Sequence, residues 1–275
     1  FNKQVTFIGV DVYEKKTTTV GQIQRFVDSM GRRMKYSVAM EDSTLMENDW
    51  LAASDEEGIP VSFIVNGEGR IAWIGYPFDL QAALPDIVNN TWDIKKALTK
   101  RNFIARLVKL DFAAIDSLKP FTGSRSDNYY GQPDIVLDSI NKFVSMEPGL
   151  KYAPIIASST FCALLKTNPQ AAYGYGKQVL ITTTYDRPAY EAIISAVESY
   201  SDKLTIPPEV YALGAEAWEL KIDYIHRVNW EVLHPYEVYH QMAEWYWRAS
   251  NKSKAIQAEK NAVRALKGKK LKKIH

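Results

Sequence analysis

The chain has 275 residues, of which 46% are hydrophobic and 24% are charged, a composition typical of a folded globular protein rather than a disordered one. Its formal net charge of +2 gives no general reason to expect nucleic acid or an anionic membrane as a partner. No apolar run approaches the roughly 20 residues that a membrane-spanning helix needs, and the first residues lack the layout of a signal peptide. The sequence therefore predicts one or two globular domains and no transmembrane segment.

Short β-branched runs alternate with amphipathic stretches over the first part of the chain, an order typical of an α/β domain. The expected strands are residues 5–12, 36–40, 61–65 and 70–74, and the expected helices are residues 19–30, 45–51 and 80–88. These elements place a first domain at residues 1–93.

The borders of these elements carry recognisable signals. The nearly continuous apolar run at residues 5–12 favours a strand that is covered on both faces. Gly31 follows the first helix in the manner of a C-cap, and Asp42 and Ser43 are positioned to cap the next helix. The segment Asn-Gly-Glu-Gly at residues 66–69 has the composition of a hairpin turn between two strands.

From residue 94 onward nearly every segment has a helical pattern, broken by proline, glycine and asparagine. Five prolines stand near predicted helix starts, where a missing amide proton costs nothing. The expected helices are residues 94–99, 103–118, 135–146, 154–166, 169–182, 188–201, 208–228, 235–250 and 252–266. Short connectors favour antiparallel neighbours, so the sequence predicts an all-helical domain of stacked hairpins at residues 94–275.

The last predicted hairpin resembles a tetratricopeptide repeat. Aromatic and small residues fall at the spacing of that repeat at Tyr239, Ala243, Tyr246, Ala255 and Ala262. The turn at residues 250–256 is also similar, and residues 167–172 resemble a second such turn, whereas Glu259 and Lys267 depart from the repeat's aromatic and proline. We therefore expect the five side chains to pack between the last helices of a tetratricopeptide-like domain.

Few residues of the sequence are candidates for catalysis or metal binding. Cys162 is the one cysteine, which excludes an internal disulfide, a CxxC pair and a multi-cysteine zinc site. Its apolar helical surroundings favour a buried side chain over a reactive thiol. The histidines are His226, His234, His240 and His275. No two of them are four residues apart, so the sequence predicts no metal site and no cofactor. The basic residues 267–273 are typical of a solvated terminus, with binding to an anionic surface as the alternative.

Three stretches within residues 3–92 resemble the thioredoxin superfamily, in its TlpA-like and AhpC/TSA-type branch. They are residues 5–12 (VTFIGVDV), 58–65 (GIPVSFIV) and 66–75 (NGEGRIAWIG). The last two are similar to that family's Gly-Ile-Pro strand, Asp-x-x-Gly turn and second strand, with Asn66 in place of the usual aspartate. The resemblance implies an α/β thioredoxin-like domain that is incomplete at its N-terminus, followed by the all-helical domain.

The resemblance also implies a substrate-binding site at Gly58, Ile59 and Pro60. In the family the peptide bond before this proline is cis, and the preceding residue offers its backbone to an extended substrate by strand addition. A trans proline that simply opens a strand is the alternative. No catalytic residue is predicted, because the family's CxxC pair, which exchanges disulfides through a thiolate, has no counterpart in this chain.

The absent CxxC segment has two explanations, namely a longer protein of which this chain is a part, which we favour, or a natural chain that lost the segment. In the family's sheet a central strand separates the strands that match residues 5–12 and 61–65. We therefore expect these two strands not to hydrogen-bond to each other, and their free edges to be paired by something outside residues 1–275.

Two functions follow as hypotheses. In the first, the chain is the C-terminal portion of a thioredoxin-family thiol-disulfide oxidoreductase, redox-inactive as given, which meets a protein substrate or redox partner. In the second, it is a non-catalytic protein-binding module in which a redox-dead thioredoxin platform supports a helical scaffold. The family resemblance implies an extracytoplasmic location, and the oligomeric state is not readable from these residues.

Overall fold

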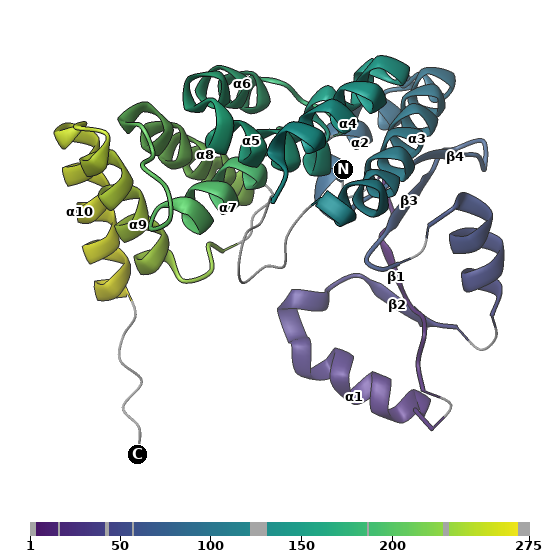
Figure 1. Cartoon of the computed structure of the whole chain (residues 1–275). Coiled ribbons are helices and arrows are strands. Elements are labelled where there is room, and N and C mark those ends of the chain that lie inside the picture. The colour runs from purple at the N-terminus through teal and green to yellow at the C-terminus, as the bar shows by residue number, and fades with distance from the viewer. Residues whose placement is uncertain are drawn as a thin grey trace. The chain divides into compact units, whose positions relative to one another are not determined.

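The chain divides into two compact units, Phe1–Leu98 and Thr99–His275 (Figure 1). The computed structural model describes residues 4–15, 17–41, 44–56, 58–121, 131–185, 187–227 and 231–268. The division falls inside α3 (Ile94–Leu118), which is continuous where the sequence predicted two helices. The reason is that residues 100–102 are polar but contain no proline or glycine, so they extend the helix as a solvated turn.

The first unit contains four short strands in two separate sheets. β1 (Ile8–Asp11) pairs in parallel with β2 (Ser37–Met40), and β3 (Ser62–Val65) pairs antiparallel with β4 (Ile71–Gly75). The helical elements of this unit are α1 (Val20–Met30), short 3-10 turns at Gly31–Met34, Ala52–Ser54 and Pro77–Asp79, a π turn at Met46–Leu51, and α2 (Leu80–Val88). Asp42 and Ser43, the expected helix caps, lie outside the described residues.

The predicted α/β thioredoxin-like domain is wrong. The four strands have only four or five residues each, whereas helices make up most of the described chain. The strands form only two small sheets of two strands each, which is too little sheet for the predicted α/β layer. The narrower expectation that residues 5–12 and 61–65 do not hydrogen-bond to each other is confirmed. What pairs with their free edges stays a prediction.

The expectation that the first strand is covered on both faces is also wrong. Phe7 is 51% exposed and Ile8 is 62% exposed, and α1 contains no buried residue. Neither α1 nor another described helix packs extensively on β1. The buried cluster of this unit lies instead where β4 meets α2, at Ala72, Ala83 and Ile87. The first unit is therefore held together mainly around β3, β4 and α2.

In the second unit all described elements are helical. After α3 come α4 (Pro133–Met146), α5 (Pro154–Thr167), α6 (Pro169–Ile181), α7 (Tyr190–Tyr200), α8 (Pro208–Arg227), α9 (Pro235–Arg248) and α10 (Lys252–Gly268), with 3-10 turns at Lys119–Phe121 and Pro148–Tyr152. The helices predicted from residue 135 onward are confirmed, because a proline opens most of them and a short polar connector ends them.

The helices of the second unit stack as successive hairpins (Figure 1). Each helix from α4 to α10 packs against the next one, and α5 also packs on α7 and α6 on α8. Glycine permits the closest approach: a Cβ on Gly176 of α6 would lie 2.5 Å from Leu213 Cδ2 and 2.7 Å from Phe161 Cε2. This arrangement buries one continuous apolar core from α3 to α10.

A buried carboxylate connects the long helix α3 to this stack. Asp111 is 2% exposed, and the backbone amides of Ile155 and Ile156 donate to its two carboxylate oxygens at 3.0 Å each. The Tyr185 hydroxyl donates to Asp111 Oδ2 at 3.1 Å. The first amides of a helix have no partner within the helix, so Asp111 serves as an N-terminal cap of α5 that comes from a different helix.

Candidate functional site

The structure places the sequence-predicted site residues Gly58, Ile59 and Pro60 in an exposed bend directly before β3. The Ile59–Pro60 peptide bond is cis, as the family resemblance implied, and the Ile59 side chain is 57% exposed. Binding of an extended chain to this bend stays a prediction.

Cys162 is part of the core rather than of a site. Its side chain is 3% exposed within α5, which confirms the prediction of a buried cysteine.

Within the described part of the chain, no three His, Cys, Asp or Glu side chains gather closely enough to hold a metal ion, and no helix has the length and apolar character needed to cross a membrane. His275 and residues 269–273 of the basic segment lie outside the described residues.

The hairpin of α9 and α10 is closed by a turn that recurs in the chain. Ser250 adopts φ of 59°, and the Asn251 side chain accepts a hydrogen bond from the Lys254 amide at 3.2 Å. Asn168 does the same at the turn into α6, where it accepts from the Ala171 amide at 3.0 Å. The two turns that resemble each other in sequence therefore share one device, an asparagine N-cap.

The residues at tetratricopeptide-like spacing pack between the last helices, as expected. Tyr246 and Ala262 are almost fully buried, Ala243 and Ala255 are buried, and Tyr239 is half-buried against a cluster of α8, α9 and α10 residues. The alanines let the two helices lie close together, and Tyr246 fills the space between them and α8.

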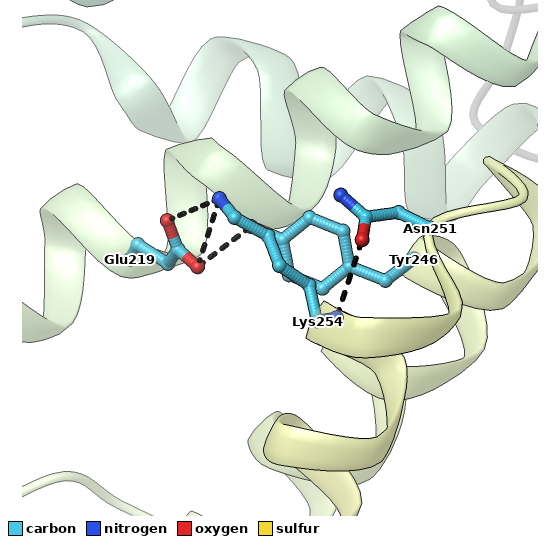
Figure 2. A network of polar contacts seen from close by, with 4 residues as sticks. All are labelled: Glu219, Tyr246, Asn251 and Lys254. Carbon is cyan, nitrogen blue, oxygen red and sulfur yellow. Dashed lines mark hydrogen bonds and ion pairs between the residues drawn. The ribbon is translucent and has the colours of Figure 1, made fainter.

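Figure 2 shows a polar network on these three helices, formed by Glu219 of α8, Tyr246 of α9, Asn251 of the turn and Lys254 of α10. The Tyr246 hydroxyl donates to Glu219 Oε1 at 2.7 Å. Lys254 Nζ donates to Glu219 Oε2 at 3.2 Å and to the Tyr246 hydroxyl at 3.1 Å. Burial, followed by the adjoining Glu219 carboxylate, raises the pKa of Tyr246 above its usual range. The network thus fixes the position of one carboxylate and one ammonium group.

Beside this network lies a groove of about 160 Å³ between α8, α9 and α10. Its apolar lining is formed by Ile222, Met242 and Ala258, which are 6%, 4% and 5% exposed. Its polar lining is formed by Glu219, Asp223, Tyr239, Tyr246, Lys254, Gln257 and Asn261. Pockets for small molecules usually measure about 300–1,000 Å³, so this α8–α10 groove suits one or two side chains of a longer ligand.

Sequence reasoning assigned Tyr239 and Tyr246 to packing and did not identify the α8–α10 groove. The available signal was on α8, where Glu219, Ile222 and Asp223 follow at the spacing i, i+3, i+4. That spacing puts two carboxylates and an aliphatic side chain on one helix face. The pattern alone does not tell whether a neighbouring helix covers the face, and the packing of α9 and α10 decides this.

Comparisons with known proteins give one partial relative. Protein FixW of Rhizobium leguminosarum is 29% identical over 104 residues, which cover 36% of this chain and 47% of FixW. The chain thus spans about half the length of this curated relative. Neither a protein-family model nor a solved structure matches the chain. The resemblance to the thioredoxin superfamily stays a prediction.

Proposed function

We propose that this chain is a protein-binding module, and that its helical unit holds a short segment of a partner protein in the α8–α10 groove. The observation that carries the proposal is the composition of this groove, which has an apolar base and a polar rim and lies on a stack of helices with a buried core. Stacked helical hairpins commonly bind their partners through such continuous surfaces.

The positions of the lining side chains support this proposal. Ile222 and Met242 belong to a buried cluster on α8 and α9, so the base of the groove keeps its shape before a partner arrives. The network of Glu219, Tyr246 and Lys254 holds one wall in place. A preformed groove loses less conformational freedom on binding than a mobile surface does, which favours affinity for a short segment.

The test is a selection of peptides that bind the whole chain, followed by a variant that fills the groove. Asn261→Trp places a large ring in the groove lining, whereas Val263→Trp places the same ring on the same helix at a side chain that is 42% exposed and outside the lining. We expect the selected peptides to lose at least about tenfold in affinity with Asn261→Trp, a free-energy change of about 1.4 kcal/mol, and to bind Val263→Trp normally. Equal binding to both variants, each checked for folding by circular dichroism, would exclude the groove as the binding site.

A second candidate function concerns the first unit. The bend at Gly58–Pro60 opens β3, an edge strand whose free backbone groups are able to pair with an extended chain. This feature favours the hypothesis that the chain is part of a thiol-disulfide oxidoreductase of the family it resembles. The test is insulin reduction by a longer parent protein that carries a CxxC pair, with and without Ile59→Asp. Loss of activity in that variant supports the hypothesis, and unchanged activity contradicts it.

A further inference from the structure

We infer that the α8–α10 groove selects a basic and aliphatic segment, in which a lysine or arginine adjoins leucine, isoleucine or valine. The inference rests on the proposed function and adds to it the chemistry of the partner. The charge of the groove lining favours a lysine or arginine in the segment, and its apolar surface independently favours an aliphatic neighbour.

The charge of the groove is set by α8. Glu219 and Asp223, the two carboxylates that line the groove, follow at the spacing i, i+4 and therefore share one face of the helix. The one cation in the described lining is Lys254, and its ammonium group is held by Glu219 at 3.2 Å. Among the described residues Asp223 has neither a hydrogen-bond nor an ion-pair partner. The groove thus offers an unpaired carboxylate beside an ion pair that is already complete.

The apolar base imposes a second condition. Ile222, Met242 and Ala258 contribute the small part of their carbon surface that stays exposed, 6%, 4% and 5%, below the polar rim. An aliphatic side chain that covers this surface gains about 25 cal/mol for each Å² of apolar area removed from water. A purely cationic segment leaves this surface in contact with water, so it forgoes that gain.

The two conditions together exclude the other simple ligand classes. A purely apolar segment would take water away from Asp223 without giving it a partner, which costs free energy. An acidic segment would meet the Asp223 carboxylate with like charge, which is repulsive. A cationic side chain at the rim with an aliphatic neighbour on the base satisfies both the carboxylate and the carbon surface.

The experiment uses the full chain and three short labelled peptides of equal length, which alternate lysine with leucine, glutamate with leucine, and lysine with serine. We expect the lysine–leucine peptide to bind at least about tenfold more tightly than either of the others. Its affinity should fall as salt is raised, because part of the attraction is between exposed charges.

The matched variants are Asp223→Asn and Glu209→Gln. Each removes one carboxylate from α8, but Glu209 lies 14 residues earlier, about 21 Å along the helix. We expect Asp223→Asn to weaken binding of the lysine–leucine peptide about threefold to fivefold, the range for an exposed ion pair, and Glu209→Gln to leave it unchanged. An equal response to both variants would overturn the inference.

The failure of this inference differs from the failure of the proposed function. If the glutamate–leucine peptide binds best and Asn261→Trp abolishes its binding, the groove still holds a peptide but its proposed chemistry is wrong. If no peptide, including those from the selection, responds to Asn261→Trp, both proposals are wrong.

Discussion

At the scale of single residues, Asp111 makes the clearest structural contribution. It is a buried carboxylate that accepts two backbone amides at the start of α5 and the hydroxyl of Tyr185. These donors lie 44, 45 and 74 residues from Asp111 along the chain. Asp111 therefore specifies how α3 docks on the stack of helical hairpins as well as how α5 begins.

Removal of this carboxylate should destabilise the chain strongly. Asp111→Ala leaves the amides of Ile155 and Ile156 without a partner, and a buried unsatisfied donor costs roughly 1–3 kcal/mol. We expect the free energy of unfolding, measured by urea denaturation, to fall by about 3 kcal/mol. Asp116→Ala removes an exposed carboxylate from the same helix and should change it by less than about 0.5 kcal/mol. Similar losses in the two variants would contradict this role of Asp111.

Because the Asp111 carboxylate is buried, we expect the free energy of unfolding of the chain to depend on pH. Burial raises the pKa of Asp111, although its hydrogen bonds from Ile155, Ile156 and Tyr185 lower it in part. A group whose pKa is higher in the folded state than in the unfolded state stabilises the fold most when it is protonated. This stabilisation is fully present below the pKa of the unfolded state, which is about 4 for aspartate. It is lost as the pH rises through the pKa of the folded state. The unfolding free energy of the wild type, minus that of Asp111→Asn, should therefore fall as the pH rises above about 4. A difference that is constant or rises over this range would contradict the expectation.

The sequence predicted some of these residue environments and not others. The burial of Cys162 followed from its apolar neighbours, and the five packed residues of the last hairpin followed from their spacing. Asp111 was not identified, because its partners lie more than 40 residues away along the chain and the helical pattern around it looks ordinary. The groove residues were missed for the same reason, since three separate helices form it.

At the scale of elements, two glycines of α6 provide a matched pair. A Cβ on Gly176 would meet Leu213 and Phe161 at 2.5 and 2.7 Å, whereas a Cβ on Gly174 would meet nothing within 4 Å. We expect Gly176→Ala to destabilise the chain by about 1–2 kcal/mol, because overpacking outweighs the gain in helix propensity. Gly174→Ala should stabilise it by about 0.5–1 kcal/mol. Thermal unfolding measures both, and the same sign for the two variants would show that α6 is not packed as described.

Helices and strands could be predicted from the sequence where the residues that specify them lie within or next to the element. Prolines at helix starts and asparagine caps are properties of the helix itself, so the helices of the second unit could be located without a structure. Whether the face of a strand is buried, in contrast, depends on which other element packs against it. Residues 5–12 have the apolar pattern of a buried strand, yet Phe7 and Ile8 are more than half exposed. Periodicity does not reveal which neighbour, if any, covers an apolar face.

At the scale of the whole molecule, the predicted α/β layer failed because the described chain is mostly helical and contains only two small sheets of two strands each. Each of the four strands was found close to its expected place, but they form two separate pairs. Correct strands therefore do not establish a correct sheet. The helical unit was predictable because its hairpins are made by neighbours in the sequence.

The single cysteine leads to a prediction for the whole chain. Disulfide reduction needs an accessible thiolate, and Cys162 is 3% exposed in the core. We expect the chain alone not to reduce a model disulfide above background, and Cys162→Ser to behave in the same way. Reduction that disappears in Cys162→Ser would show that the thiol is reactive.

The central claim is that a partner segment docks on the helical unit, in the α8–α10 groove, rather than at the bend before β3. Methyl NMR distinguishes the two places directly, because Ile222 and Met242 line the groove whereas Ile59 lies in the bend. On addition of the lysine–leucine peptide, we predict that the methyl signals of Ile222 and Met242 shift while that of Ile59 stays in place. A shift at Ile59 with unchanged signals from Ile222 and Met242 would contradict the claim.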